Sequence, residues 1–139
     1  MEKDNAIKLL LILVFLTIAV VSLIYSFVII VDVKEIEMRV TVKSNRVGIN
    51  LDTDKLWFGM ISPGSSASRE IELTNNRDYM LQAILKTSGE LKEYVSLSEN
   101  PALIKPKELK KIKVTLSLPK DMAYGNYTGN LRIIFKRRL

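Results

Sequence analysis

The stretch WFGMISPGSSASREIELTNN, residues 57–76, has the pattern that decides the fold. Its opening apolar run contains a glycine, and the Pro63-Gly64 pair that follows predicts a chain reversal, because proline presets a turn angle and glycine accepts a positive φ. Ile71 and Leu73 then alternate with polar residues, which is the period of a β-strand with one buried face. Two asparagines mark the next turn. The stretch therefore predicts two short strands joined by a tight turn, as in the wall of a β-sandwich.

The rest of residues 32–139 repeats this alternation of short strands and turns. The clearest strand is LKKIKVTLSLP, residues 109–119, whereas residues 99–108, with two prolines, are expected to form a loop. About seven to eight strands, with turn signals every ~8–12 residues and no helical period, predict an antiparallel β-sandwich. The residues expected to face its core are Ile36, Met38, Val40, Val42, Trp57, Ile71, Leu73, Ile112, Val114, Leu116, Leu118, Tyr127, Leu131, Ile133 and Phe135.

Before the sandwich comes an uncharged apolar segment, LLLILVFLTIAVVSLIYSFVIIV, at residues 9–31. As a helix its 23 residues would span roughly 35 Å, which exceeds the ~30 Å hydrocarbon core of a bilayer. The few hydroxyl groups in the segment can be satisfied within a helix. The sequence therefore predicts a tail (residues 1–8), a transmembrane helix (9–31) and a β-sandwich (32–139) with almost no linker.

Two alternatives concern this segment. A cleaved signal peptide usually has an apolar region of ~7–15 residues and a small-residue cleavage site, whereas this run is longer and ends in bulky residues. Basic residues are more numerous after the helix than before it, which favours a cytoplasmic domain. However, long domains translocate largely regardless of charge. We therefore expect the cell membrane as the location and an extracellular sandwich as the orientation.

The chain contains no cysteine and no histidine. Disulfides, thiolate chemistry, nucleophile systems that need histidine, and the usual zinc sites are therefore excluded. Asp52 and Asp54 are a weak candidate for a calcium pair, and Glu70 and Glu72 share one face of a strand, where pairing with lysine or arginine is expected. We expect a protein that is not an enzyme and that has no catalytic residues, no metal and no cofactor.

The net charge is +6, and it belongs to residues 32–139 because the tail is balanced. The densest basic cluster is Lys105, Lys107, Lys110, Lys111 and Lys113. It is a candidate face for an acidic glycan, protein or lipid, and the alternative is a charged edge that prevents aggregation. Nucleic acid is not expected, because no aromatic residues interleave with these lysines. Trp57 is a second candidate contact if it is exposed rather than buried.

One N-glycosylation acceptor is present, Asn126 in the sequence NYT, and it would be used only on an exported surface. It lies within a longer pattern, Pro119, Gly125, Tyr127 and Gly129, that opens the last expected strand.

With the Phe-Gly end of the strand at residues 58–59, the Pro-Gly turn and the closing asparagine pair, this pattern resembles immunoglobulin-like domains of microbial membrane-anchored surface proteins, archaeal ones in particular, over residues 51–135. The resemblance implies an immunoglobulin-like sandwich. It implies no catalytic residues and does not define one task.

We therefore expect a non-catalytic, single-pass membrane protein whose β-sandwich is an interaction or structural module at the cell surface. The expected partners are the lipid bilayer and a surface protein, and self-assembly is a further option. Strand addition at a sheet edge would need only backbone donors and acceptors. The alternative is a subunit of a surface filament or of a motility or secretion assembly.

Overall fold

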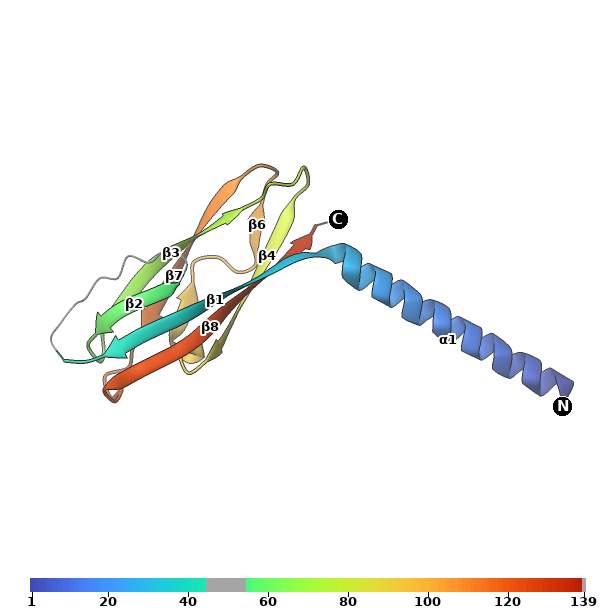
Figure 1. Cartoon of the computed structure of the whole chain (residues 1–139), viewed down its shortest axis with the longest axis horizontal. Coiled ribbons are helices and arrows are strands. Elements are labelled where there is room, and N and C mark those ends of the chain that lie inside the picture. Colours follow the sequence, from blue (N-terminus) through green and yellow to red (C-terminus); the bar gives the residue numbers. More distant parts are fainter. Residues whose placement is uncertain (45–54, 139) are drawn as a thin grey trace.

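The chain consists of an N-terminal helix followed by a domain of β-strands (Figure 1). The computed structural model describes residues 1–44 and 55–138, apart from the side chains of residues 26–28. The sequence VGINL at residues 47–51 predicts a short strand, but it lies outside the described residues, as do Asp52 and Asp54. The elements are α1 (Glu2–Ile29), β1 (Ile30–Val42), β2 (Leu56–Ile61), β3 (Ser66–Thr74), β4 (Leu81–Gly89), the 3-10 turn η1 (Lys92–Tyr94), β5 (Val95–Leu97), β6 (Ala102–Ile104), β7 (Leu109–Ser117) and β8 (Gly125–Arg137).

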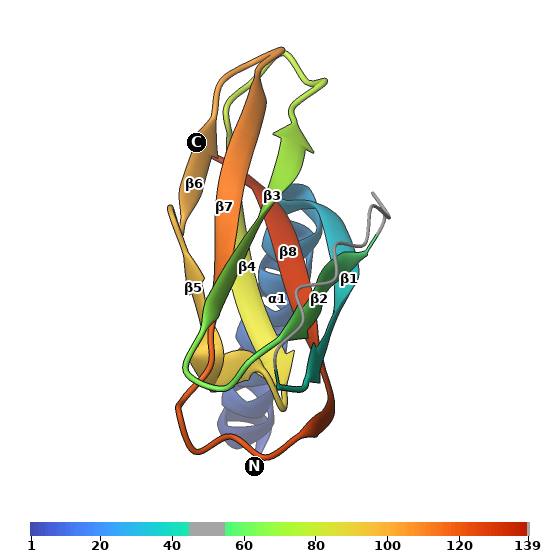
Figure 2. The same ribbon diagram turned by 90° about the vertical axis from the view of Figure 1, so that its left-hand side faces the viewer.

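The strands form two sheets that lie one in front of the other (Figure 2). A curled five-stranded sheet has the order β2-β1-β8-β4-β6, and a three-stranded sheet has the order β3-β7-β5. Paired strands are antiparallel except β1 and β2, which run parallel with Met38 opposite Leu56. The prediction of an antiparallel fold is wrong at this pair. A parallel pair needs a connection of a dozen or more residues, and residues 43–55 supply that length.

The predicted loop at residues 99–108 contains a strand, and this prediction is also wrong in part. Within it β6 pairs with β4, placing Ile104 opposite Leu81. Ala102 and Ile104 are fully buried because they alternate toward the core. The strand is only three residues long, and it lies at the edge of its sheet. Prolines on both sides of such a short edge strand do not interrupt the hydrogen-bond ladder.

The core lies between the two sheets and contains most of the side chains that the alternation predicts. From β3 and β7 come Ile71, Leu73, Ile112, Val114 and Leu116, and from β1 and β8 come Met38, Val40, Val42, Leu131, Ile133 and Phe135. Leu118 is also buried, and Ile36 and Tyr127 are half-buried against the core. The Pro63-Gly64 turn is present as predicted, because the Ser65 N–H donates to the Ser62 carbonyl at 3.1 Å and Gly64 has φ +78°.

Trp57 is not a core residue, so that expectation is wrong. Its neighbour Phe58 is buried, and because successive side chains on a strand point to opposite faces, only one of the two can face the core. Two cations lie near the half-buried Trp57 ring, with the Arg39 guanidinium carbon at 5.6 Å and the Lys55 ammonium at 5.3 Å from its centroid. The indole Nε1 has no hydrogen-bond partner among the described residues.

The helix α1 extends away from the β-domain (Figure 1). Its segment Glu2–Tyr25 is long and apolar enough to cross a membrane, and none of it is buried against the rest of the chain. A signal sequence shares these properties of length and composition. Because α1 ends at Ile29 and β1 begins at Ile30, the helix passes into the domain with no linker, and the last residues of the segment expected as helix belong to β1.

Candidate functional site

The end of the domain that adjoins α1, which we call the helix-proximal end, gathers segments that are far apart in the sequence. β8 ends beside the beginning of β1, with Phe135 opposite Asp32. Leu81, the first residue of β4, lies opposite both Arg137 of β8 and Ile104 of β6. The β3–β4 turn (residues 75–80) and the β6–β7 turn (residues 105–108) are therefore at this same end, beside the C-terminal strand.

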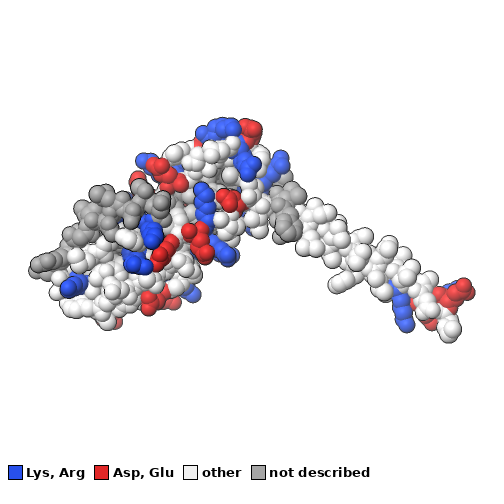
Figure 3. Space-filling model, in the orientation of Figure 1, with Lys and Arg blue, Asp and Glu red and all other residues white. Residues whose placement is uncertain are grey.

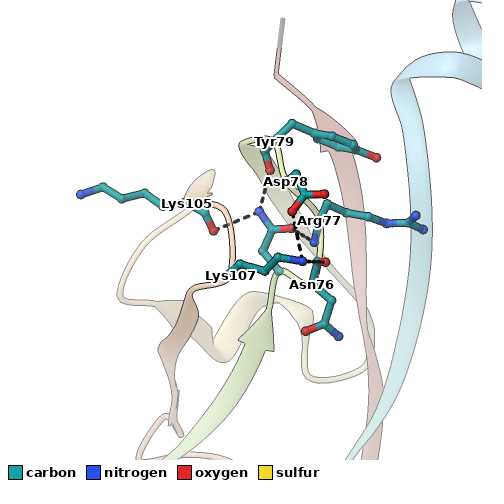
Figure 4. Close-up of polar contacts among 7 residues, drawn as sticks. Asn76, Arg77, Asp78, Tyr79, Lys105 and Lys107 are labelled. Atoms are coloured by element: carbon teal, nitrogen blue, oxygen red, sulfur yellow. Dashed lines mark hydrogen bonds and ion pairs between the residues drawn. The ribbon is translucent and has the colours of Figure 1, made fainter.

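A buried asparagine joins the two turns (Figure 4). Asn75 is fully buried, and its Nδ2 donates to the carbonyls of Tyr79 at 2.8 Å, Lys105 at 3.0 Å and Ile104 at 3.1 Å. Its Oδ1 accepts from the Arg77 N–H at 2.9 Å. Since a buried polar group is costly without partners, these bonds hold the two turns against each other.

Three lysines of the predicted basic face are paired with acids, so their charges are partly neutralised. Lys107 contacts Asp78 at 3.2 Å, and Lys111 contacts Glu72 at 3.6 Å. Half-buried Lys110 contacts Glu99 at 2.8 Å, and its ammonium also donates to the Leu103 carbonyl at 2.9 Å.

The remaining two lysines of this face lie in different places. Lys113 is exposed on β7 opposite Glu70. Lys105 is exposed at the helix-proximal end, and its ammonium has no acidic partner among the described residues. The five lysines therefore do not form one face of unpaired charge. A partner contact at this face stays a prediction.

The Lys110 contact changes the acidity of Glu99. The hydrogen bond from the Lys110 ammonium lowers the pKa of the Glu99 carboxyl below its usual value. Burial opposes this effect, whereas attraction to the Lys110 charge and a hydrogen bond with the Leu103 backbone add to it. The pair joins the segment before β6 to the beginning of β7, where Lys110 is on the same strand face as the buried Ile112. Because the Glu99 side chain is 41% exposed, the pair is a modest stabilising contact rather than a catalytic acid.

Sequence reasoning named Lys105 as part of a basic cluster, but it did not group Lys105 with the other cations that the fold brings together at the helix-proximal end. None of them has an ion pair within the described part of the chain. Two of them lie over aromatic rings: the Lys34 ammonium is 5.9 Å from the Phe135 centroid, and the Arg137 guanidinium carbon is 4.5 Å from the Tyr79 centroid. The set, which we call the basic collar, is Lys34, Arg77, Lys105, Lys136, Arg137 and Arg138.

Blue side chains are visible over this end of the domain in Figure 3. Figure 4 shows the side chains of Arg77 and Lys105 pointing in opposite directions from the joined turns. A hollow of about 300 Å³ lies beside Arg77, with Asp32, Lys34 and Phe135 among its other lining residues. The collar could have been found from the sequence only if the direction of every strand had been known.

At the opposite end of the domain, Asn126 is exposed at the beginning of β8, where a glycosylation acceptor would be accessible. Its Oδ1 accepts a hydrogen bond from the Thr41 hydroxyl at 2.8 Å, and its Nδ2 donates none to the described residues. Modification of Asn126 stays a prediction. Nearby, the Tyr127 hydroxyl donates to the Ala123 carbonyl at 2.8 Å, four residues upstream.

Among the described residues, no group of three or more aspartate or glutamate side chains is placed to hold a metal ion. Glu72, which shares a strand face with Glu70, contacts Lys111 as expected. Comparison of the chain with models of protein families, with curated proteins and with solved structures finds no match. The functional argument therefore depends on the chain's own residues.

Proposed function

We propose that the chain is a non-catalytic, single-pass membrane protein whose β-domain is an interaction or structural module held at the cell surface. One observation carries the proposal: the apolar helix α1 is exposed along its described length and continues directly into β1. Leu9 and Phe15, for example, are 71% and 77% exposed. An apolar surface of this extent is stable only if another apolar medium covers it. A bilayer provides such a medium, and a helix satisfies its own backbone within it.

The immunoglobulin-like character of the domain is part of this proposal. Two β-sheets enclose its core, and Tyr127, at the beginning of the last strand, donates its hydroxyl to the Ala123 backbone. In immunoglobulin-like sandwiches a tyrosine near the start of a strand makes such a bond to the backbone a few residues upstream. The parallel pairing of β1 with β2 within the five-stranded sheet is a departure from the antiparallel sheets of an immunoglobulin-like sandwich.

A binding or structural role fits the chemistry of the chain better than catalysis does. Without histidine or cysteine, an active site would need convergent carboxylates, lysines or hydroxyls with strongly altered acidity. Within the described part of the chain, the carboxyl whose pKa is clearly lowered is that of Glu99, and the main cause is its hydrogen bond from Lys110. Binding needs none of these groups, because exposed side chains and sheet edges suffice.

Membrane topology is the experiment that tests the proposal. Intact cells and lysed cells that express the full chain with a C-terminal epitope are treated with protease, and membranes are separately extracted with alkaline carbonate. Retention in the membrane after extraction, with loss of the epitope from intact cells, is the expected result. Release by carbonate would refute the anchor. An epitope that survives until lysis would refute the surface location.

Cross-linking on the same cells separates the two modes of action. A single heteromeric band supports docking of a different protein, whereas a ladder of identical copies supports the alternative of a filament or assembly subunit.

A further inference from the structure

We propose that the basic collar is a docking surface for anionic phospholipid headgroups of the same bilayer that α1 enters, and that it holds the β-domain upright on the membrane. The proposal rests on the membrane anchoring proposed above. It adds a lipid class, a contact surface and a defined orientation of the domain.

The first observation is the short distance between the end of α1 and the collar cations. Lys34 lies five residues after Ile29, the last residue of α1, and a strand rises ~3.3 Å per residue. The collar residue Lys34 is therefore within about 17 Å of the helix end. Lys136 lies opposite Ile30, the residue that directly follows the helix, so it is nearer still. A headgroup layer several ångströms thick and a Debye length of ~8 Å bring these cations within reach of lipid phosphates.

The second observation is the net positive charge of the helix-proximal end. The acids at the helix-proximal end are Asp32, Glu35, Asp78 and Glu108, and three of them have partners within the protein. Asp78 contacts Lys107, the Asp32 carboxylate accepts from the Val33 N–H, and the Glu108 carboxylate accepts from the Lys105 N–H. Backbone hydrogen bonds leave the carboxylate charges in place, so the six collar cations and Lys107 stand against four acids. The net charge of this end is therefore +3 (seven minus four), and the surface turned toward the bilayer is positive.

The third observation is that internal contacts hold several of the collar residues in place. Arg77 and Lys105 are on turns that Asn75 ties together, so their backbone positions are fixed before any ligand is bound. Lys34 and Arg137 lie over the rings of Phe135 and Tyr79. Because the collar is already ordered, contact with lipid costs little conformational entropy in the backbone.

A bilayer fits the collar better than a soluble anion or nucleic acid does. The cations are spread around one end of the domain, and they come from β1, from two turns and from β8, rather than converging in one cleft. Anchoring by α1 would also hold lipid phosphates at a high effective concentration near the collar. A soluble partner would not have this advantage. Tyr79, an aromatic residue at this end, is already stacked by Arg137 and so is not free to stack a base.

The test uses the full chain in vesicles of phosphatidylcholine alone or with ~30% phosphatidylglycerol, a fraction chosen to resemble an anionic leaflet. Because the chain has no cysteine, one introduced cysteine carries a fluorophore without competition. Asn76→Cys places it at the helix-proximal end, where Asn76 is exposed, and Tyr124→Cys places it at a loop beside the beginning of β8 as the position control. Vesicle lipids with a nitroxide headgroup quench a fluorophore that lies near the surface.

We expect strong quenching at position 76 with the anionic lipid, weaker quenching in phosphatidylcholine or in high salt, and little quenching at position 124 under any condition. Replacing three collar residues with glutamine (Arg77→Gln, Lys105→Gln, Arg138→Gln) lowers the docked-to-free ratio. At roughly fivefold for each of the three basic residues, the expected decrease is about 125-fold at low salt. The matched control, Lys86→Gln with Lys92→Gln and Lys120→Gln, removes the same charge from other exposed sites and leaves the ratio within about twofold.

Equal quenching at position 76 in both lipids, or an equal loss in the collar and control variants, overturns the proposal. The lipid and salt comparison uses the unsubstituted collar, so it decides the question even if the triple variant folds poorly. Vesicle flotation after carbonate treatment separates the two proposals. A chain that floats but shows no lipid dependence refutes the collar alone, whereas a chain that does not float refutes the anchor and the collar together.

Discussion

Replacement of Asn75 by alanine tests the structural core of the helix-proximal end. The Asn75 amide has two N–H groups that three carbonyls share, and its oxygen accepts one further bond, so alanine removes three hydrogen-bond equivalents. At ~0.5–1.5 kcal/mol for each bond, we expect the free energy of unfolding to decrease by about 2–4 kcal/mol. The melting temperature would fall by roughly 8–15 °C for a domain of this size.

The measurement is urea denaturation of the full chain in a non-ionic detergent, followed by the fluorescence of the single tryptophan, Trp57. Asn76→Ala is the matched control, because Asn76 is exposed and its side chain makes no hydrogen bond to the described residues. We expect that control to change stability by less than about 0.5 kcal/mol. If Asn75→Ala is no more destabilising than Asn76→Ala, the buried amide does not hold the turns and the reasoning is refuted.

Asn75→Asp is a more specific test, because aspartate keeps the shape of the side chain while its carboxylate has no N–H donors. At neutral pH a carboxylate would face three carbonyl oxygens, so this variant should be less stable than Asn75→Ala. Burial and these oxygens would raise the pKa of the new carboxyl in the folded state. The destabilisation relative to wild type should therefore be full at neutral pH and decrease as the pH falls toward the ordinary aspartate pKa, about 3.9.

Two further substitutions test single contacts. Because the folded-state pKa of Glu99 is lowered by Lys110, its contribution to stability is present above the ordinary glutamate pKa and is lost as the pH falls through the lower folded value. Glu99→Gln should therefore decrease the free energy of unfolding at pH 7 by less than ~1 kcal/mol, and this effect should disappear in acid. The control is Glu93→Gln, because Glu93 is exposed. An equal effect of the two substitutions would contradict the pairing of Glu99 with Lys110. Tyr127→Phe removes the hydroxyl bond to Ala123 but keeps the ring. We expect the free energy of unfolding, measured by thermal denaturation, to decrease by about 0.5–1.5 kcal/mol. An unchanged melting temperature would show that the bond does not stabilise the loop.

Local patterns predicted the strands with regular alternation. In β7 the apolar residues Ile112, Val114 and Leu116 occupy every second position, and all three are fully buried. The same period failed where two aromatic residues are adjacent, because alternation shows that one faces inward but not which one. Phe58 occupies the core position, and Trp57 lies on the other face of the strand near Arg39 and Lys55.

Features that depend on long-range pairing were not visible in the sequence. Periodicity carries no information on strand direction, so the parallel pairing of Met38 with Leu56 was missed. Similarly, Lys34 and Arg138 are separated by most of the domain in sequence, and only the register of β1, β8 and β4 places them at the same end. The predicted lysine cluster was contiguous in sequence, but alternation along β7 and pairing with acids divided it.

The junction between α1 and β1 also determines how the domain would respond to a mechanical load. β1 lies between β2 and β8 in the sheet order, and it is paired with β8 from Ile30 to Val42 and with β2 from Met38 to Val42. A pull exerted on the domain against an anchored helix would act along this strand, so the ladder bonds, which lie across the strand direction, would be sheared together rather than opened one at a time. A tether built in this way transmits tension from the sheet to the bilayer without a slack segment between them.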